Sequence, residues 1–312
     1  QFFKMKKTLV LLLFFVLFNT LSNAQQDAQY TQYMYNTISV NPAYAGSRDV
    51  LSLTGLYRTQ WVGLKGAPRS MTFSGHSPLR NEKLGLGVSV VRDEIWIQDE
   101  TYIDVDFSYT INTSANAKLA FGLKAGAHLL NIDFTRTNPE NTTDDNFSAS
   151  NNIDNQFSPN VGLGVYYYTN KFYIGYSAPT LLRTNYYDDV NSVSYLAKDR
   201  INHYLIAGYV FDLNESLKFK PAVLFKAVQG APLQADLSGN FLLNDKLTLG
   251  LAYRWDAALS GLLGFQISDD FMIGYSYDWE TTELNNYNSG SHEIFLRYEF
   301  SENQKILSPR FF

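Results

Sequence analysis

Few residues in this 312-residue chain have types and spacing that could do chemistry. Ser74 and His76 form one local pair, and residues two apart in a strand share a face. A serine beside a histidine could act as a nucleophile and its base if the fold also brought an acid to them. Such pairs are common in strands by chance, and nothing in the sequence completes a triad. We therefore expect that the chain is not an enzyme.

Metal and phosphate binding have equally little support. The chain has no cysteine, and its histidines have neither ligand spacing nor an acidic cluster beside them: His76, His128, His203 and His292. Glycine-rich runs at 84–87 and 161–165 lack the following helix and the spacing of a phosphate-binding loop. The sequence therefore predicts no metal ion and no cofactor.

Strict alternation of apolar and polar residues dominates the chain from residue 50 onward. This period of two predicts strands, and no helical period intervenes. Each run is near the ~9–11 residues that a tilted transmembrane strand needs. We count fourteen such runs, at residues 50–60, 69–78, 83–92, 101–112, 117–130, 157–168, 171–178, 202–213, 217–228, 233–243, 246–255, 258–268, 270–279 and 292–300. Pro221 removes a ladder hydrogen bond within its run, so we expect a bulge or a shifted register there.

The connections between these runs alternate in length. One set is short and rich in turn residues, as in the periplasmic turns of outer-membrane barrels: 79–83, 112–117, 169–171, 212–216, 243–245 and 268–270. The other set contains long polar segments that suit external loops: 132–156, 179–200 and 280–291. Only closed barrels satisfy the backbone in lipid without helices. The predicted fold is therefore all-β, a transmembrane antiparallel β-barrel of about 14 strands.

The first 24 residues have the pattern of a secretory signal peptide. Lys4, Lys6 and Lys7 precede an apolar run at 9–18, which is too short to span a membrane. Loss of these three lysines would take the net charge from −5 to −8, which argues against nucleic acid or anionic lipid headgroups as the main partner. We expect a leader at 1–24, an N-terminal periplasmic or lumenal segment at 25–49, an outer-membrane barrel at 50–300 and a tail at 301–312.

Short motifs near both ends of the chain point to a known family. They comprise Gln32-Tyr33, Asn36, Asn41-Pro42-Ala43-Tyr44-Ala45-Gly46, Arg58, Gln60-Trp61, Gly66-Ala67-Pro68, His76 and the ending Pro309-Arg310-Phe311-Phe312. In these positions the chain resembles the PorP/SprF family of the type IX secretion and gliding system. The resemblance covers essentially the whole chain after the leader.

The resemblance implies an integral outer-membrane protein, without catalysis, that is needed to export or anchor a secreted surface protein. Such partners are often adhesins with a type B C-terminal sorting domain. Other type IX secretion components and outer-membrane lipid are further expected partners. The alternative function is a passive outer-membrane porin or solute channel, although inward-facing aromatic residues such as Tyr166 and Phe295 argue against an open pore.

One candidate functional site is the tyrosine-rich segment ahead of the first strand. Its residues Tyr33, Asn41, Pro42, Tyr44 and Gly46 are expected to pack in the lumen, with a polar tip on each phenol. The residue before proline avoids the helical region, and glycine permits a second turn. The segment could brace the barrel, serve as a functional platform, or do both.

A second candidate site lies at the end of the first strand. Arg58, Gln60 and Trp61 are expected near the outer rim, where they would bind the partner. A guanidinium can grip a carboxylate in forked geometry, and tryptophan is enriched in interface hot spots. The alternative is that Trp61 belongs to the aromatic girdle and that Arg58 pairs with a lumen acid, such as Asp104 or Glu293.

Overall fold

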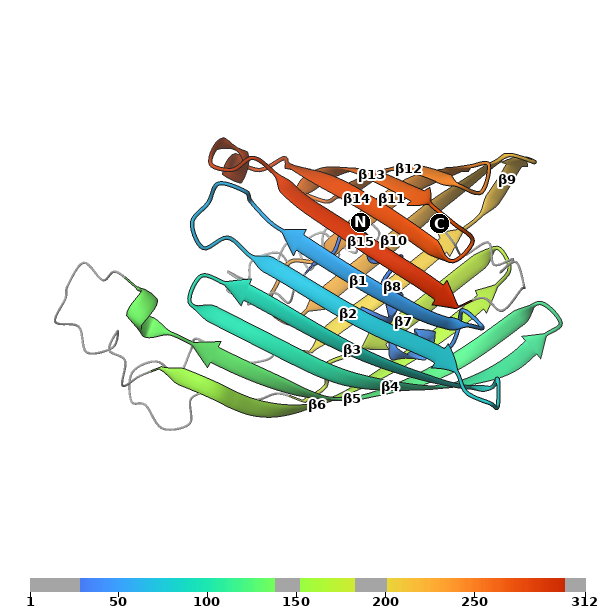
Figure 1. Cartoon of the computed structure of the whole chain (residues 1–312), viewed down its shortest axis with the longest axis horizontal. Helices are drawn as coiled ribbons and strands as arrows, with labels where there is room; N and C mark the ends of the chain where they lie inside the picture. Colours follow the sequence, from blue (N-terminus) through green and yellow to red (C-terminus); the bar gives the residue numbers. More distant parts are fainter. Residues whose placement is uncertain (1–28, 138–151, 183–200, 301–312) are drawn as a thin grey trace, which may run out of the picture.

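The computed structural model describes residues 29–137, 152–182 and 201–300, which form one closed β-sheet around a filled interior (Figure 1). The predicted leader and C-terminal tail lie outside the described residues. The strands are β1 (Leu51–Thr59), β2 (Arg69–Pro78), β3 (Leu84–Ile95), β4 (Gln98–Ser114), β5 (Ala117–Ile132), β6 (Ile153–Thr169), β7 (Phe172–Ala178), β8 (Asn202–Tyr209), β9 (Phe211–Asn214), β10 (Leu217–Val228), β11 (Gln234–Leu243), β12 (Leu247–Arg254), β13 (Ala258–Gln266), β14 (Phe271–Glu280) and β15 (Ser291–Phe300).

The sheet closes because its first and last strands pair with each other. β1 and β15 are antiparallel along their whole length, from Leu51 opposite Phe300 to Thr59 opposite His292. The segments β8 and β9 are separated only by Val210 and both pair with β10, so they share one position in the ring. Fifteen segments therefore make a fourteen-stranded antiparallel barrel, which confirms the predicted fold class.

Pro221 accounts for the break between β8 and β9. Toward β11 it pairs in register with Gly239, without a bulge. Toward the other neighbour, β10 pairs with β8 from Ala222 onward and with β9 as far as Phe219. Proline has no N–H to donate, and the pairing of β10 with β8 and β9 is interrupted there. Val210, between β8 and β9, donates its N–H to the carbonyl of Lys171 at 2.7 Å. A bulge at Pro221 itself is thus wrong, and the irregularity appears as the break between β8 and β9 and as a register shift at Leu217 and Lys218 in the β9–β10 pairing.

The two faces of the sheet differ in chemistry, as the alternation predicts. In β12, Leu249 and Leu251 point outward and are 43% and 67% exposed, whereas Thr248 points inward and is 1% exposed. An outward apolar band of this kind suits lipid and would be unusual in water. Within the described ranges, no helix is long and apolar enough to cross a membrane.

The two ends of the barrel carry different connections (Figure 1). At one end, called here the short-turn end, brief turns join the strands at the predicted places. The other end, the long-loop end, carries residues 60–68, the β3–β4 hairpin, and the turns η3 (Phe134–Arg136) and η6 (Glu283–Asn286). The predicted loops 132–156 and 179–200 are described only in part. Outer-membrane barrels place their longer loops outside the cell, which assigns the long-loop end to the exterior.

Substitution of an outward residue near mid-strand should reveal the lipid-facing surface. Leu249→Arg is expected to lower the free energy of unfolding by about 2–4 kcal/mol, because a charge near the bilayer midplane is costly. Leu249→Ala, which removes apolar surface without adding charge, is the matched control and should cost less. Urea titrations of the protein folded in lipid vesicles measure both. Equal losses for the two variants would contradict the assignment of this face to lipid.

Candidate functional site

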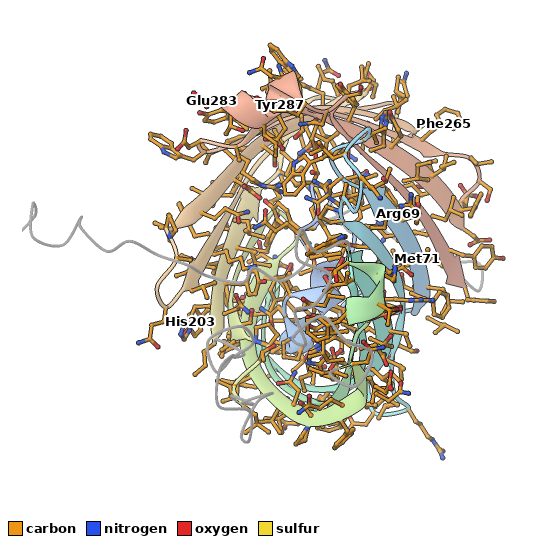
Figure 2. All side chains as sticks on the ribbon, turned by 90° about the vertical axis from the view of Figure 1, so that its left-hand side faces the viewer. Arg69, Met71, His203, Phe265, Glu283 and Tyr287 are labelled. Carbon is orange, nitrogen blue, oxygen red and sulfur yellow. The ribbon has the colours of Figure 1, made fainter. Side chains whose placement is uncertain are left out.

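Residues 29–49, called here the lumen segment, lie inside the ring of strands. Figure 2 looks into the barrel from the long-loop end and shows the blue ribbon of this segment within the ring. Between Tyr30 and Arg48, every residue except Ser39 and Gly46 is buried. The apolar side chains of the segment form one continuous core with inward residues of the barrel, among them Tyr166 and Phe295. The segment therefore fills the interior in the manner of a protein core.

Two short turns shape the lumen segment, η1 (Thr37–Ser39) and η2 (Pro42–Tyr44). The side chain of Asn41 accepts a hydrogen bond from the N–H of Ala43 at 3.0 Å and donates to the carbonyl of Val165 in β6 at 3.1 Å. Gly46 has a φ of 71°, and its N–H donates to Nδ1 of His76 in β2 at 3.2 Å. Asn41 thus both shapes the turn and ties it to the wall.

Glycines on the inward face make room for these turns. A Cβ atom at Gly122 of β5 would overlap the backbone of Ala43, and one at Gly164 of β6 would overlap the side chain of Asn41. A Cβ atom at Gly85 of β3 would likewise overlap the carbonyl of Ala45. The glycine-rich runs of the sequence therefore form a cradle for the lumen segment, since only glycine allows this close approach.

A buried group of charges fastens the start of the lumen segment. The guanidinium of Arg58, on β1, lies 2.7 Å from Asp278 of β14 and 3.0 Å from Glu293 of β15. The backbone N–H groups of Thr31 and Gln32 donate to the Glu293 carboxylate at 2.9 and 2.8 Å. The Thr31 hydroxyl donates to Asp278 at 2.7 Å. We call these five residues the carboxylate clamp.

Because the carboxylate clamp is buried, each of its charges depends on the presence of all its partners. Arg58, Asp278 and Glu293 are at most 2% exposed. A buried ion costs several kcal/mol in lost hydration unless it is paired and hydrogen-bonded. One cation faces two anions here, and the N–H and O–H donors of the lumen segment supply the remaining stabilisation. The clamp is complete only when the segment is in place.

Strand β15 contacts the lumen segment along its inward face. The ring of Phe295 stacks on Tyr35 with centroids 4.3 Å apart, and the guanidinium of Arg297 lies 5.7 Å from the Tyr35 ring centroid. Glu299 forms a buried ion pair with Arg48, with one Nη2–Oε2 contact of 2.6 Å. Sequence reasoning named Glu293 only as an alternative partner of Arg58 and did not single out Asp278, Glu299 or Arg48. For Glu299, the available signal was the alternation of charged residues in the inward phase of β15.

The predicted lumen residues all lie in the segment. Tyr33 and Tyr44 are buried, and the Tyr44 ring meets those of His76 and Tyr166 edge-on. Asn41, Pro42 and Gly46 shape the turns described above.

The predicted rim residues divide into two groups. Arg58 is inside the barrel and pairs with Glu293, the acid that the alternative interpretation named, whereas Asp104 pairs with Lys124 at 2.9 Å. Gln60 and Trp61 lie above it at the long-loop end and are half-buried. The indole of Trp61 donates to Glu280 at 2.9 Å, and its backbone N–H donates to the Ser291 hydroxyl at 3.1 Å. A partner-binding role for these residues stays a prediction.

Ser74 and His76 contact the lumen segment rather than each other. The Ser74 hydroxyl donates to the Asn36 side chain at 2.9 Å, and His76 accepts the hydrogen bond from Gly46. Both contacts are typical of buried polar residues that hold a packed segment. Within the described part of the chain, no group of three histidine or acidic residues is placed to hold a metal ion.

Comparisons with known proteins agree with this architecture. The family described as type IX secretion system membrane protein PorP/SprF matches residues 22–298. Among solved structures, the CymD monoaromatic hydrocarbon channel is similar at 14% identity and a TM-score of 0.51, covering 88% of this chain and 94% of that one. The Acinetobacter baumannii outer membrane protein Omp33 is similar at 10% identity and a TM-score of 0.47, covering 80% and 98%. At 14% identity, the likeness to CymD concerns the fold alone. A comparison with curated proteins gives no match.

Removal of the clamp cation should destabilise the whole barrel. Arg58→Met keeps the side-chain volume but leaves two buried carboxylates without their cation, so we expect a loss of about 3–5 kcal/mol in the free energy of unfolding. Lys118→Met is the control, because it breaks a solvent-exposed pair with Asp49 and should cost less than about 1 kcal/mol. Urea unfolding in detergent micelles measures both. Similar stabilities of the two variants would show that the clamp does not hold the fold.

Proposed function

The chain belongs to the PorP/SprF family of type IX secretion system membrane proteins, and we propose that it exports a partner protein or anchors it at the cell surface. The expected partner is a secreted adhesin with a type B C-terminal sorting domain, assisted by other components of the secretion system. The proposal includes delivery to the outer membrane by a signal peptide cleaved after Ala24. The rival function is passive passage of solutes.

The filled lumen is the observation that carries this proposal. Porins conduct through a polar, water-filled interior, whereas the inward residues here contact the lumen segment. A solute could pass only by displacing a segment held by the carboxylate clamp, the Arg48–Glu299 pair and the glycine cradle. A barrel packed with its own chain is better suited to presenting surfaces to another protein than to conducting solutes.

The rim site is proposed at Gln60 and Trp61, with Arg58 holding the strand beneath them. Trp61 has a φ of 45°, a conformation that bulky residues rarely adopt and that persists only where neighbours enforce it. The backbone of Val62 exchanges hydrogen bonds with Gly290 and Ser289 at 2.9 and 2.7 Å, which joins residues 60–68 to the β14–β15 connection. This loop is therefore a rigid surface at the exterior end, which supports a docking role.

Copurification tests the proposed function directly. The barrel is purified from its native outer membrane in mild detergent, and the proteins that accompany it are identified by mass spectrometry. A surface protein with a C-terminal sorting domain is the expected partner. A barrel that purifies alone and passes solutes freely would favour the channel instead.

Solute flux through the barrel should be low and should depend on how the lumen segment packs against the barrel wall. Proteoliposomes containing the wild-type barrel are expected to swell slowly in small sugars. Gly122→Val should raise the rate, because the new side chain occupies the place of η2, while Gly55→Val is the control, since a Cβ atom there meets no atom within 4 Å. Wild-type swelling at the rate of a general porin would overturn the proposal of a closed barrel.

Loss of the rim side chains should reduce surface display without unfolding the barrel. For Gln60→Ala combined with Trp61→Ala, we expect a folded, heat-modifiable barrel and several-fold less partner on the cell surface, since truncation of an interface tryptophan often costs about 2 kcal/mol or more. Trp279→Ala is the control, because that exposed indole belongs to β14 and donates to Asn285. Normal display by the abundant, folded double variant would exclude the rim as the docking site.

A further inference from the structure

A cavity lies on the outer side of the barrel wall at the long-loop end. It has a volume of about 330 Å3 and is enclosed by residues 60–68, the β3–β4 hairpin and η3. Its charged lining consists of three arginines and two carboxylates, a net charge of +1 (3 − 2): Arg69, Arg92, Arg136, Glu94 and Asp99. The site is separate from the lumen segment and plays no part in the carboxylate clamp.

Two of these arginines are unusual in the direction they face. Arg69 and Arg92 are exposed in the outward phase of β2 and β3, whereas the lysines and arginines of the other described strands are all in the inward phase. Outward residues of a membrane barrel contact lipid or its headgroups. The two cations therefore lie on the surface that lipid covers.

The lipid-facing surface continues directly below these cations. On β2, the next outward residues after Arg69 are Met71 and Phe73, which are 46% and 59% exposed (Figure 2 labels Arg69 and Met71). Arg92 is opposite Met71 in the β2–β3 pairing, and Val90 follows it in the outward phase of β3. A cationic cavity thus sits immediately above an apolar strip on the same wall.

The two carboxylates in the cavity both pair with the same arginine, which leaves Arg69 available. Arg92 is balanced by Asp99 at 2.5 Å and by Glu94 at 2.8 Å. Arg69 forms no ion pair within the described ranges and is exposed. A guanidinium next to an apolar surface is well suited to a planar, doubly hydrogen-bonded contact with a phosphate.

The walls of the cavity are held rigidly. Trp96, at the tip of the β3–β4 hairpin, has a φ of 54°, and its N–H donates to the carbonyl of Gly66 at 3.0 Å. A Cβ atom at Gly66 would lie 3.0 Å from the Trp96 ring, so a larger residue would crowd the indole. A strained conformation of a bulky residue indicates a position that the surrounding structure enforces. The loop and the hairpin therefore form one preorganised cavity.

We propose that this cavity binds the phosphate headgroup of a glycolipid in the outer leaflet, with its acyl chains along the strip formed by Met71, Phe73 and Val90. Arg69 grips the phosphate, and Arg136 adds a second positive charge. The apolar strip selects a lipid over an acidic peptide, because a peptide docked at this depth would expose its backbone polar groups to lipid. Headgroup recognition by a basic pocket beside apolar wall residues is a recurring form of lipid binding.

Lipid titration of the folded full-length chain tests the proposal. The protein in neutral detergent micelles is titrated with bisphosphorylated lipid A or with its dephosphorylated form, and bound lipid is counted by native mass spectrometry. We expect saturable binding of the phosphorylated form and about tenfold weaker binding by Arg69→Gln, which loses a charge-assisted contact. Arg80→Gln, at an exposed arginine of the short-turn end, is the matched control and should bind like the wild type.

Equal binding of the dephosphorylated lipid would overturn the proposal, and so would unchanged binding by a folded Arg69→Gln variant. Displacement of the lipid by an equal concentration of inorganic phosphate or of a tetraglutamate peptide would also overturn it. Arg136→Gln, in η3 outside the strands, provides a second test if Arg69→Gln fails to fold. It should also weaken binding, and unchanged binding by that variant would count against the site. Arg69→Lys, which keeps the charge without the fork, should bind with intermediate affinity.

Discussion

The carboxylate of Glu293 connects the three parts of the chain that must meet for this barrel to close around its own N-terminal segment. Glu293 on β15 is the register partner of Arg58 on β1, so their ion pair crosses the seam between the last strand and the first. The same carboxylate accepts the N–H groups of Thr31 and Gln32. Because an unpaired buried ion costs several kcal/mol, closure of the seam and seating of the lumen segment reinforce each other.

A polar lumen is therefore no evidence of a water-filled channel in this protein. The inward hydroxyls and amides of the barrel are acceptors and donors for a segment that arrives with its own polar backbone. The Ser108 hydroxyl donates to the carbonyl of Ala45 at 2.7 Å, and that of Ser177 donates to the carbonyl of Val40 at 2.6 Å. A buried backbone outside regular structure needs such partners. The polar inward face is what permits an irregular segment to be buried there.

The fold could be predicted from the sequence because its signals are local. Period-two alternation fixes which residues face lipid, and the lengths of the connections fix which end carries the loops. An interruption beside Pro221 was expected from the sequence. Its location in the neighbouring strand depends on strand pairing and could not be predicted. The partner of Arg58 was likewise left between Asp104 and Glu293, since both occupy the inward phase. Arg58 and Glu293 are 235 residues apart in sequence. Only the pairing of β1 with β15 shows that Glu293 is the partner of Arg58.

The distribution of arginines separates the structural surfaces of the molecule from the surfaces open to other molecules. Inside the barrel each arginine has a carboxylate nearby: Arg48 and Arg297 have Glu299, Arg58 has Asp278 and Glu293, and Arg254 has Asp236. These pairs are buried or, at Arg254, nearly so, and their donors are committed to the fold. At the long-loop end, Arg69 is exposed on the outer wall and Trp61 lies on a rigid loop. The exposed Arg69 and the loop that carries Trp61 are therefore the surfaces at the long-loop end that lipid, or the partner proposed above, can reach.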